Sequence, residues 1–231
     1  MAHARPELDP RDVVAPGADI FTEPEEIDPL TLRNLGPLAP LAGTWEGRGV
    51  DRHPVAEGVE ESPYVERIVF EPIDPQPNGP QLLYGLRYHQ RVQEPDDPAT
   101  FHDQVGYWLW EPATHRIVQS LAIPRAQVAL AGGVAAPDAR AFTVNAVRGS
   151  AMFGICSGPF LEQAFTTLEY TLTFTVHDDG SLSYEQDTVL RVRGREEPFH
   201  HTDASTLRRV AAPMLNPSAA AEGTGPPGAG R

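Results

Sequence analysis

Apolar and polar residues alternate one by one along most of this chain, and this two-residue period limits the folds open to it. Between positions 168 and 176, threonines and one glutamate alternate with five large apolar residues, Leu168, Tyr170, Leu172, Phe174 and Val176. Successive side chains of a β-strand point to opposite faces of its sheet, so the pattern predicts a strand with one buried face. The following His-Asp-Asp-Gly sequence at 177–180 predicts a tight turn into a second strand.

The same period recurs in ten segments, several of which are joined by evident turn sequences. The predicted strands cover residues 43–50, 63–71, 81–93, 101–111, 115–124, 126–134, 140–148, 166–177, 181–193 and 198–210. We therefore predict an all-β fold, a ten-stranded antiparallel up-and-down barrel with room for one small ligand. Leucines spaced around prolines over 27–41 predict a short helical cap near the N-terminal end of the barrel.

Composition separates the barrel from two flanking segments. Residues 1–30 hold eight acidic side chains against two arginines, and we expect an acidic, disordered arm there. Residues 31–210 are expected to form the barrel domain. Residues 211–231 are rich in alanine, glycine and proline, which predicts a flexible tail.

The charged residues and the single cysteine exclude several classes of function. The net charge of −14 opposes binding to nucleic acid, and the absence of lysine excludes a Schiff-base enzyme and a lysine-containing phosphate loop. Cys156 has no partner for an internal disulfide, which fits a reducing compartment. No apolar run approaches the roughly 20 residues of a membrane helix, and no secretory signal is visible. We expect a cytoplasmic protein without nucleic-acid or membrane partners, whose barrel mouth or exposed edge could support a homodimer.

The histidine pair His200-His201 is the candidate for metal ligation. Adjacent residues on a strand face opposite sides, so one of the two must point into the barrel. His201 shares its parity with Phe199 and Leu207, which favours His201 as the inward residue and leaves His200 as the second choice. No second cluster has zinc spacing, so a lone histidine would suit haem better than bare zinc. The alternative is a buried histidine that is only hydrogen-bonded. His53 and His102 fall at a turn and a strand end, and both are expected at the surface.

The sequence 43–49, Gly-Thr-Trp-Glu-Gly-Arg-Gly, places one tryptophan among alternating glycines at the start of the first predicted strand. Glycine weakens a strand unless the backbone bends or another group comes close. The motif therefore has two interpretations, a bulged strand with Trp45 in the core or a bare strand face that a flat ligand approaches. In both, Trp45, Gly47 and Gly49 act structurally rather than chemically.

This motif resembles the Gly-x-Trp-x-Gly-x-Gly signature that opens members of the nitrobindin family. Three further stretches resemble that family in the same order: 64–70, then 102–108 with 122–124, and the closing 201–209. The resemblance runs from about Leu38 to Val210, and its motifs are specific in combination.

The resemblance implies a barrel similar to fatty-acid-binding proteins that holds one haem b per chain at an open mouth. It implies His201 as the iron ligand and a cofactor-binding region that includes Thr44, Trp45, Gly47 and Gly49. It also implies a ferric iron that isomerises peroxynitrite to nitrate and binds nitric oxide. Residues 149–165 look bulkier than the family's usual connection and could fill part of the cavity. The alternative is a haem-free barrel that carries a small lipophilic ligand.

Overall fold

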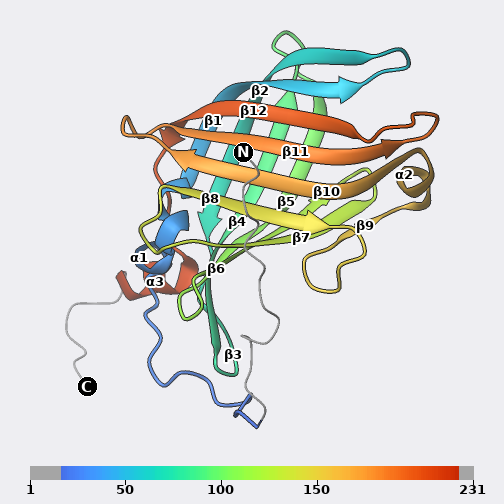
Figure 1. Cartoon of the computed structure of the whole chain (residues 1–231). Coiled ribbons are helices and arrows are strands. Elements are labelled where there is room, and N and C mark those ends of the chain that lie inside the picture. Colours follow the sequence, from blue (N-terminus) through green and yellow to red (C-terminus); the bar gives the residue numbers. More distant parts are fainter. Residues whose placement is uncertain (1–16, 224–231) are drawn as a thin grey trace.

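The computed structural model describes residues 17–223, and most of them form one closed antiparallel barrel (Figure 1). Its strands are β1 (Gly43–Pro54), β2 (Val59–Pro72), β4 (Gln81–Gln93), β5 (Thr100–Glu111), β6 (Arg116–Ile123), β7 (Gln127–Val134), β8 (Ala141–Val147), β10 (Phe165–Val176), β11 (Leu182–Val192) and β12 (Phe199–Ala211). The first strand pairs with β12 and the second with β4, so the sheet closes on itself. The prediction of a ten-stranded all-β barrel is confirmed.

Short elements close one end of the barrel and extend its wall. The predicted cap consists of α1 (Thr31–Asn34) and the 3₁₀ helix η2 (Gly36–Leu41). Its Leu35, Leu38 and Leu41 are fully buried against the barrel core. Two short strands, β3 (Gln76–Asn78) and β9 (Ile155–Ser157), pair with β4 and β7. The remaining helices are α2 (Pro159–Ala164) and α3 (Pro217–Gly223).

The barrel interior is apolar near the cap and polar towards the other end. Trp45 lies in the apolar part, where its indole N–H donates to the carbonyl of Leu41 at 2.7 Å. Trp108 and Phe174 meet edge to face there, with ring centroids 5.5 Å apart. Beyond them the inward side chains become polar and hydrogen-bond to one another: Tyr64, Glu66, Tyr88, Gln90, Gln104, Gln119, Tyr170 and Tyr184. This polar layer forms the floor of the barrel's open end, which we call the mouth.

The flanking segments differ in how far the structure describes them. Residues 1–16 of the predicted acidic arm and 224–231 of the predicted tail lie outside the described residues. Residues 17–30 contain no helix or strand. No sequence pattern indicated α3, whose start is fixed by long-range contacts: buried Asn216 donates to the carbonyl of Pro29 and to Asp74, both at 2.8 Å. No helix among the described residues is long and apolar enough to cross a membrane.

Candidate functional site

Strand β12 determines which histidine of the pair enters the barrel. Its inward residues are Phe199, His201, Asp203, Ser205 and Leu207, and the residues between them face outward. The His201 side chain is 31% exposed, whereas that of His200 is 59% exposed and contacts Asp187 on the outer face, Nδ1 to Oδ2, at 2.7 Å. The structure therefore places His201 inward at the mouth, as strand parity predicts.

Asp51 connects His201 to a second histidine at the mouth. Its Oδ1 lies 2.6 Å from Nε2 of His201, a hydrogen-bond distance. Its Oδ2 lies 2.9 Å from Nδ1 of His53, close enough for an ion pair but without hydrogen-bond geometry. Burial alone would raise the pKa of Asp51, but the hydrogen bond and charges of the two histidines lower it. The carboxylate therefore stays ionised and holds the outer nitrogen of His201.

The sequence pattern predicts that the first strand ends at residue 50, which leaves His53 in a turn. In the structure β1 continues to Pro54, and its register with β2 extends along the whole strand. Asp51 and His53 thus follow Trp45, Gly47 and Gly49 on the inner face. Alternation counted from Trp45 places Asp51 and His53 on the inner face. The strand was nevertheless predicted to end earlier, because the polar residues at this end have the composition of a turn.

His102 faces the mouth from the wall opposite His201. Between β5 and β12 lie three strands in one direction and five in the other. Burial lowers the pKa of His102, and the charges of Arg125, His201 and Asp51 also act on it. The expectation that His102 lies at the surface is therefore wrong. His102 lies on the same strand face as Trp108 and Trp110, which are both buried, and this alternation could have predicted that His102 points inward.

A carboxyl-rich network lies directly below His201. The Tyr64 hydroxyl donates to Asp203 and lies 2.9 Å from the Tyr184 hydroxyl, which in turn donates to Glu66 at 3.2 Å. Burial, together with the charges of Glu66 and Asp51, raises the pKa of Asp203 to about 7, although the Tyr64 hydrogen bond opposes this. Burial likewise raises the pKa of Glu66. The floor of the mouth thus contains two carboxyl groups, those of Asp203 and Glu66, whose pKa values lie above the usual range.

The lumen beneath the mouth is almost filled. A cavity of about 10 Å³ remains between the polar layer and the aromatic core, whereas a pocket for a cofactor-sized ligand measures roughly 300–1,000 Å³. A larger hollow of about 480 Å³ lies on the outer face and is lined by outward residues that include Arg52, Thr171, Glu185 and Thr202. That hollow does not contain His201. A flat cofactor ligated by His201 would therefore lie at the mouth and not in the lumen.

Apolar residues cover the wall beside His201. Leu190, Val192 and Phe199 form a buried cluster separate from the main core, and Phe165 packs against it. Phe199 lies two residues before His201 on the same face of β12. Arg195 holds this end of the barrel in place, because its Nη2 donates to the carbonyls of Val55 and Gly58 at 2.6 and 2.8 Å.

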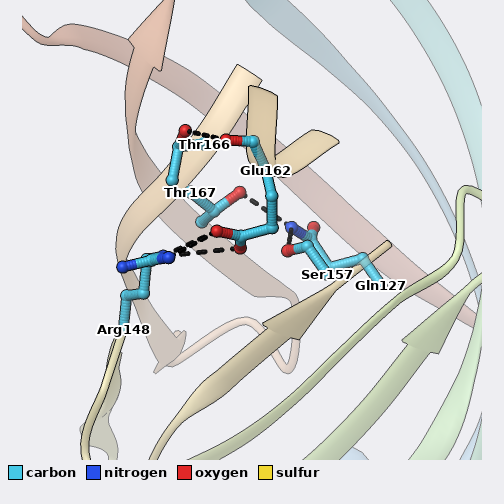
Figure 2. A network of polar contacts seen from close by, with 6 residues as sticks. All are labelled: Gln127, Arg148, Ser157, Glu162, Thr166 and Thr167. Carbon is cyan, nitrogen blue, oxygen red and sulfur yellow. Dashed lines mark hydrogen bonds and ion pairs between the residues drawn. The ribbon is translucent and has the colours of Figure 1, made fainter. Parts of the chain in front are cut away.

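Residues 149–165 complete the rim of the mouth where β8 ends. Figure 2 shows Gln127 of β7 reaching Ser157 and Thr167, each at 2.8 Å. Figure 2 also shows Glu162 of α2 paired with Arg148, with Nε and Oε2 3.0 Å apart. The helix α2 buries none of its residues, and β9 extends the sheet beside β7. The segment therefore forms part of the barrel wall and does not fill the lumen, although Ile155 packs against the core.

The glycine-tryptophan motif lies deeper in the barrel than the mouth. Trp45 precedes His53 by eight positions on β1, which corresponds to about 26 Å along a strand. A Cβ atom at Gly47 would come within 2.6 Å of Leu207, and one at Gly49 would collide with the Tyr64 hydroxyl. The structure thus fills the bare face with side chains and separates Thr44, Trp45 and Gly47 from His201.

The residues at the mouth fit a haem group better than a bare metal ion. Among residues 17–223, no group of three or more His, Cys, Asp and Glu side chains is placed to hold a metal ion. A porphyrin supplies its own four nitrogen ligands, so one inward histidine beside an apolar wall is a sufficient donor set. The nitrogen that would ligate iron, Nε2 of His201, is engaged by Asp51. Ligation would exchange that hydrogen bond for the iron.

Three comparisons connect this geometry with known proteins. The model of the THAP4-like, heme-binding beta-barrel domain matches residues 34–209. Peroxynitrite isomerase 2 of Mycobacterium marinum is 35% identical over 74 residues, and the peroxynitrite isomerase of Mycobacterium leprae is 32% identical over 74 residues. Each match covers 32% of this chain and 39% of the relative. The crystal structure of Rv2717c from M. tuberculosis superposes with a TM-score of 0.55 at 21% identity, over 80% of this chain and 99% of that one.

Proposed function

The chain belongs to the THAP4-like, heme-binding β-barrel family, as its resemblance to nitrobindins implied, and from this premise we propose that it is a ferric haem protein that isomerises peroxynitrite to nitrate. Two observations support the activity: the curated relatives carry the name peroxynitrite isomerase, and strand β12 points His201 into the mouth. Binding of nitric oxide at the same position belongs to the proposal.

The inward placement of His201 carries this proposal. Strand parity fixes it there, and the apolar wall at Phe199 and Leu190 gives a flat cofactor a surface to cover. Arg125 at the rim is exposed and close enough to act on His102, so it could pair with a haem propionate. One haem b per chain, held by His201, belongs to the proposal.

The chemistry that haem supplies when bound is a ferric iron with Lewis-acid character toward a peroxide oxygen. The protein's own contributions are few. His201 would hold the iron, and the residues around His102 bound the mouth opposite His201. Isomerisation needs no net proton or electron, so a mouth that orients a small ligand and limits its escape is sufficient.

The lipophilic-carrier alternative is less well supported by the lumen. A lipid chain inside the barrel needs a cavity of several hundred Å³, and the interior cavity measures about 10 Å³. The aromatic core and the polar layer would both have to open. We therefore favour a cofactor at the mouth.

The test is the fate of peroxynitrite in the presence of the haem-loaded protein. We expect faster decay than in buffer and a higher yield of nitrate relative to nitrite. The haem-free protein and free haemin at the same concentration are the controls. If the loaded protein accelerates decay no more than free haemin does, the isomerase proposal fails.

A further inference from the structure

His102 is connected to a chain of buried polar side chains that crosses the interior. Gln104 lies two residues further along the same face of β5 and its side chain acts on the pKa of His102, and the amide nitrogen of Gln104 donates to the Tyr88 hydroxyl at 2.7 Å. Gln119 of β6 donates to the same hydroxyl at 3.2 Å, and the Tyr170 hydroxyl donates to the carbonyl oxygen of Gln119 at 3.0 Å. Gln104 and Gln119 are 6% and 1% exposed, so both amides are shielded from bulk water and depend on these partners.

The two amides converge on one phenol oxygen, and this fixes their direction. With its nitrogen on Tyr88, Gln104 has its carbonyl oxygen left for His102, which then supplies the hydrogen. Tyr88 itself is held between rings, with Phe70 stacked at 5.9 Å and Trp108 at 6.4 Å between centroids. The chain therefore has little freedom to rearrange.

The proton of Tyr88 requires an acceptor of its own, because the phenol oxygen already accepts two amide hydrogens. The interior cavity of about 10 Å³ borders Tyr88 and is also lined by Gln90 and Tyr184. That volume is close to the minimum for one water molecule, which would need about three polar partners. A single water in this cavity would accept the Tyr88 proton and would join the chain to the network below His201.

We propose that Gln104, Tyr88 and Gln119 position His102 so that its free ring nitrogen faces the mouth as a hydrogen-bond acceptor. Burial lowers the pKa of His102, so the ring is neutral near pH 7 and has one donor and one acceptor. The donor is committed to Gln104, which leaves the acceptor for a ligand.

This arrangement determines which form of a ligand the mouth prefers, and in that respect it rests on the proposed function. Peroxynitrous acid carries a proton that it can donate to His102. The peroxynitrite anion and nitric oxide offer only acceptors and gain no hydrogen bond from the ring. The site is thus selective for the protonated acid, with Gln104, Tyr88 and Gln119 as positioning residues.

Neutron diffraction from deuterated crystals of the haem-free protein tests the direction of the chain. We expect deuterium on the His102 nitrogen that faces Gln104, none on the other ring nitrogen, and one D₂O molecule beside Tyr88. Deuterium on the mouth-facing nitrogen would overturn the proposal. Because no haem is present, this result is independent of whether the protein isomerises peroxynitrite.

Nitrogen-15 NMR of the His102 ring tests the positioning role in solution. Tyr88→Phe keeps the ring packing and removes the acceptor of both amides, so we expect one tautomer in the unmodified protein and a mixture in the variant. Tyr84→Phe is the matched control, because its hydroxyl donates to the carbonyl of Asp28 at 3.2 Å and lies outside the chain. A single unchanged tautomer in Tyr88→Phe would show that these residues do not position His102.

Discussion

Replacing Asp51 by alanine should make the protein bind haem more tightly. In the haem-free barrel, Asp51 Oδ1 holds the Nε2 atom of His201 at 2.6 Å, and this nitrogen is the one farther from the backbone that iron would reach. The ionised carboxylate accepts the Nε2 hydrogen, and iron can bind this nitrogen only after that hydrogen has left, so the hydrogen bond and the iron exclude each other. Removing the carboxylate destabilises only the haem-free state, and the haem affinity rises by the free energy of the lost contact.

The size of the effect follows from the geometry of the pair. A hydrogen bond to a charged group contributes about 1.5–3 kcal/mol when well shielded. The His201 and Asp51 side chains are 31% and 16% exposed, so solvent reduces the contribution toward the lower end of that range. A gain of about 1.5 kcal/mol corresponds to a roughly tenfold smaller dissociation constant.

Haemin titration, followed by absorbance near 400 nm, measures this change. Asp187→Ala is the matched control, because Asp187 makes the equivalent contact with His200 at 2.7 Å on the outer face. We expect an unchanged affinity in the control. A tenfold loss of affinity in Asp51→Ala would refute competition and indicate that the carboxylate supports the ligated imidazole instead.

Three further predictions concern the barrel itself. Gly47→Val should lower the stability by about 1–3 kcal/mol through overpacking, since its Cβ would press on Leu207 and the carbonyl of Thr206; an unchanged melting temperature would contradict this. The Asp203 carboxyl keeps its proton to about pH 7 when folded but releases it near pH 4 when unfolded. The unmodified protein should therefore lose stability, relative to Asp203→Asn, as the pH rises from 4 to 7, by at most about 4 kcal/mol. Denaturant titrations measure the free energy of unfolding of both proteins across this pH range. If the difference between them does not change with pH, the pKa of Asp203 is not raised. Arg148→Ala should change global stability by less than about 1 kcal/mol, because the ion pair with Glu162 is exposed. It should nevertheless speed amide exchange over 155–164, and unchanged exchange would show that the pair does not hold the rim.

The barrel could be predicted from sequence because its strands carry their own signal. The alternation over 168–176 and the turn at 177–180 specify the β10–β11 hairpin without any other part of the chain. The short strands β3 and β9 carry no such signal. Each has three residues whose pairing depends on a neighbouring strand, and β9 exists because β8 stops before its neighbours do. Contacts of that kind cannot be derived from local pattern.

The candidate site was predicted only in part, for a related reason. The alternating parity of β12 identifies His201 as the inward histidine. Asp51, His53 and His102 were missed because polar residues at strand ends have the composition of turns, although they point into the mouth. Extending the parity of buried Trp45 and Trp108 to the strand ends would have found all three. Of the two interpretations of the glycine motif, the structure agrees with the bulged strand that has Trp45 in the core, since Leu207 and Tyr64 occupy the space beside Gly47 and Gly49.

A haemin titration of three proteins tests whether His201 holds haem at the mouth. We expect the unmodified protein and His200→Ala to bind one haem per chain with the same Soret band. We expect His201→Ala to lose most of its affinity while its circular dichroism spectrum stays unchanged. Equal haem binding by His201→Ala and the unmodified protein, or no haem binding by the unmodified protein, would show that His201 does not hold haem at the mouth.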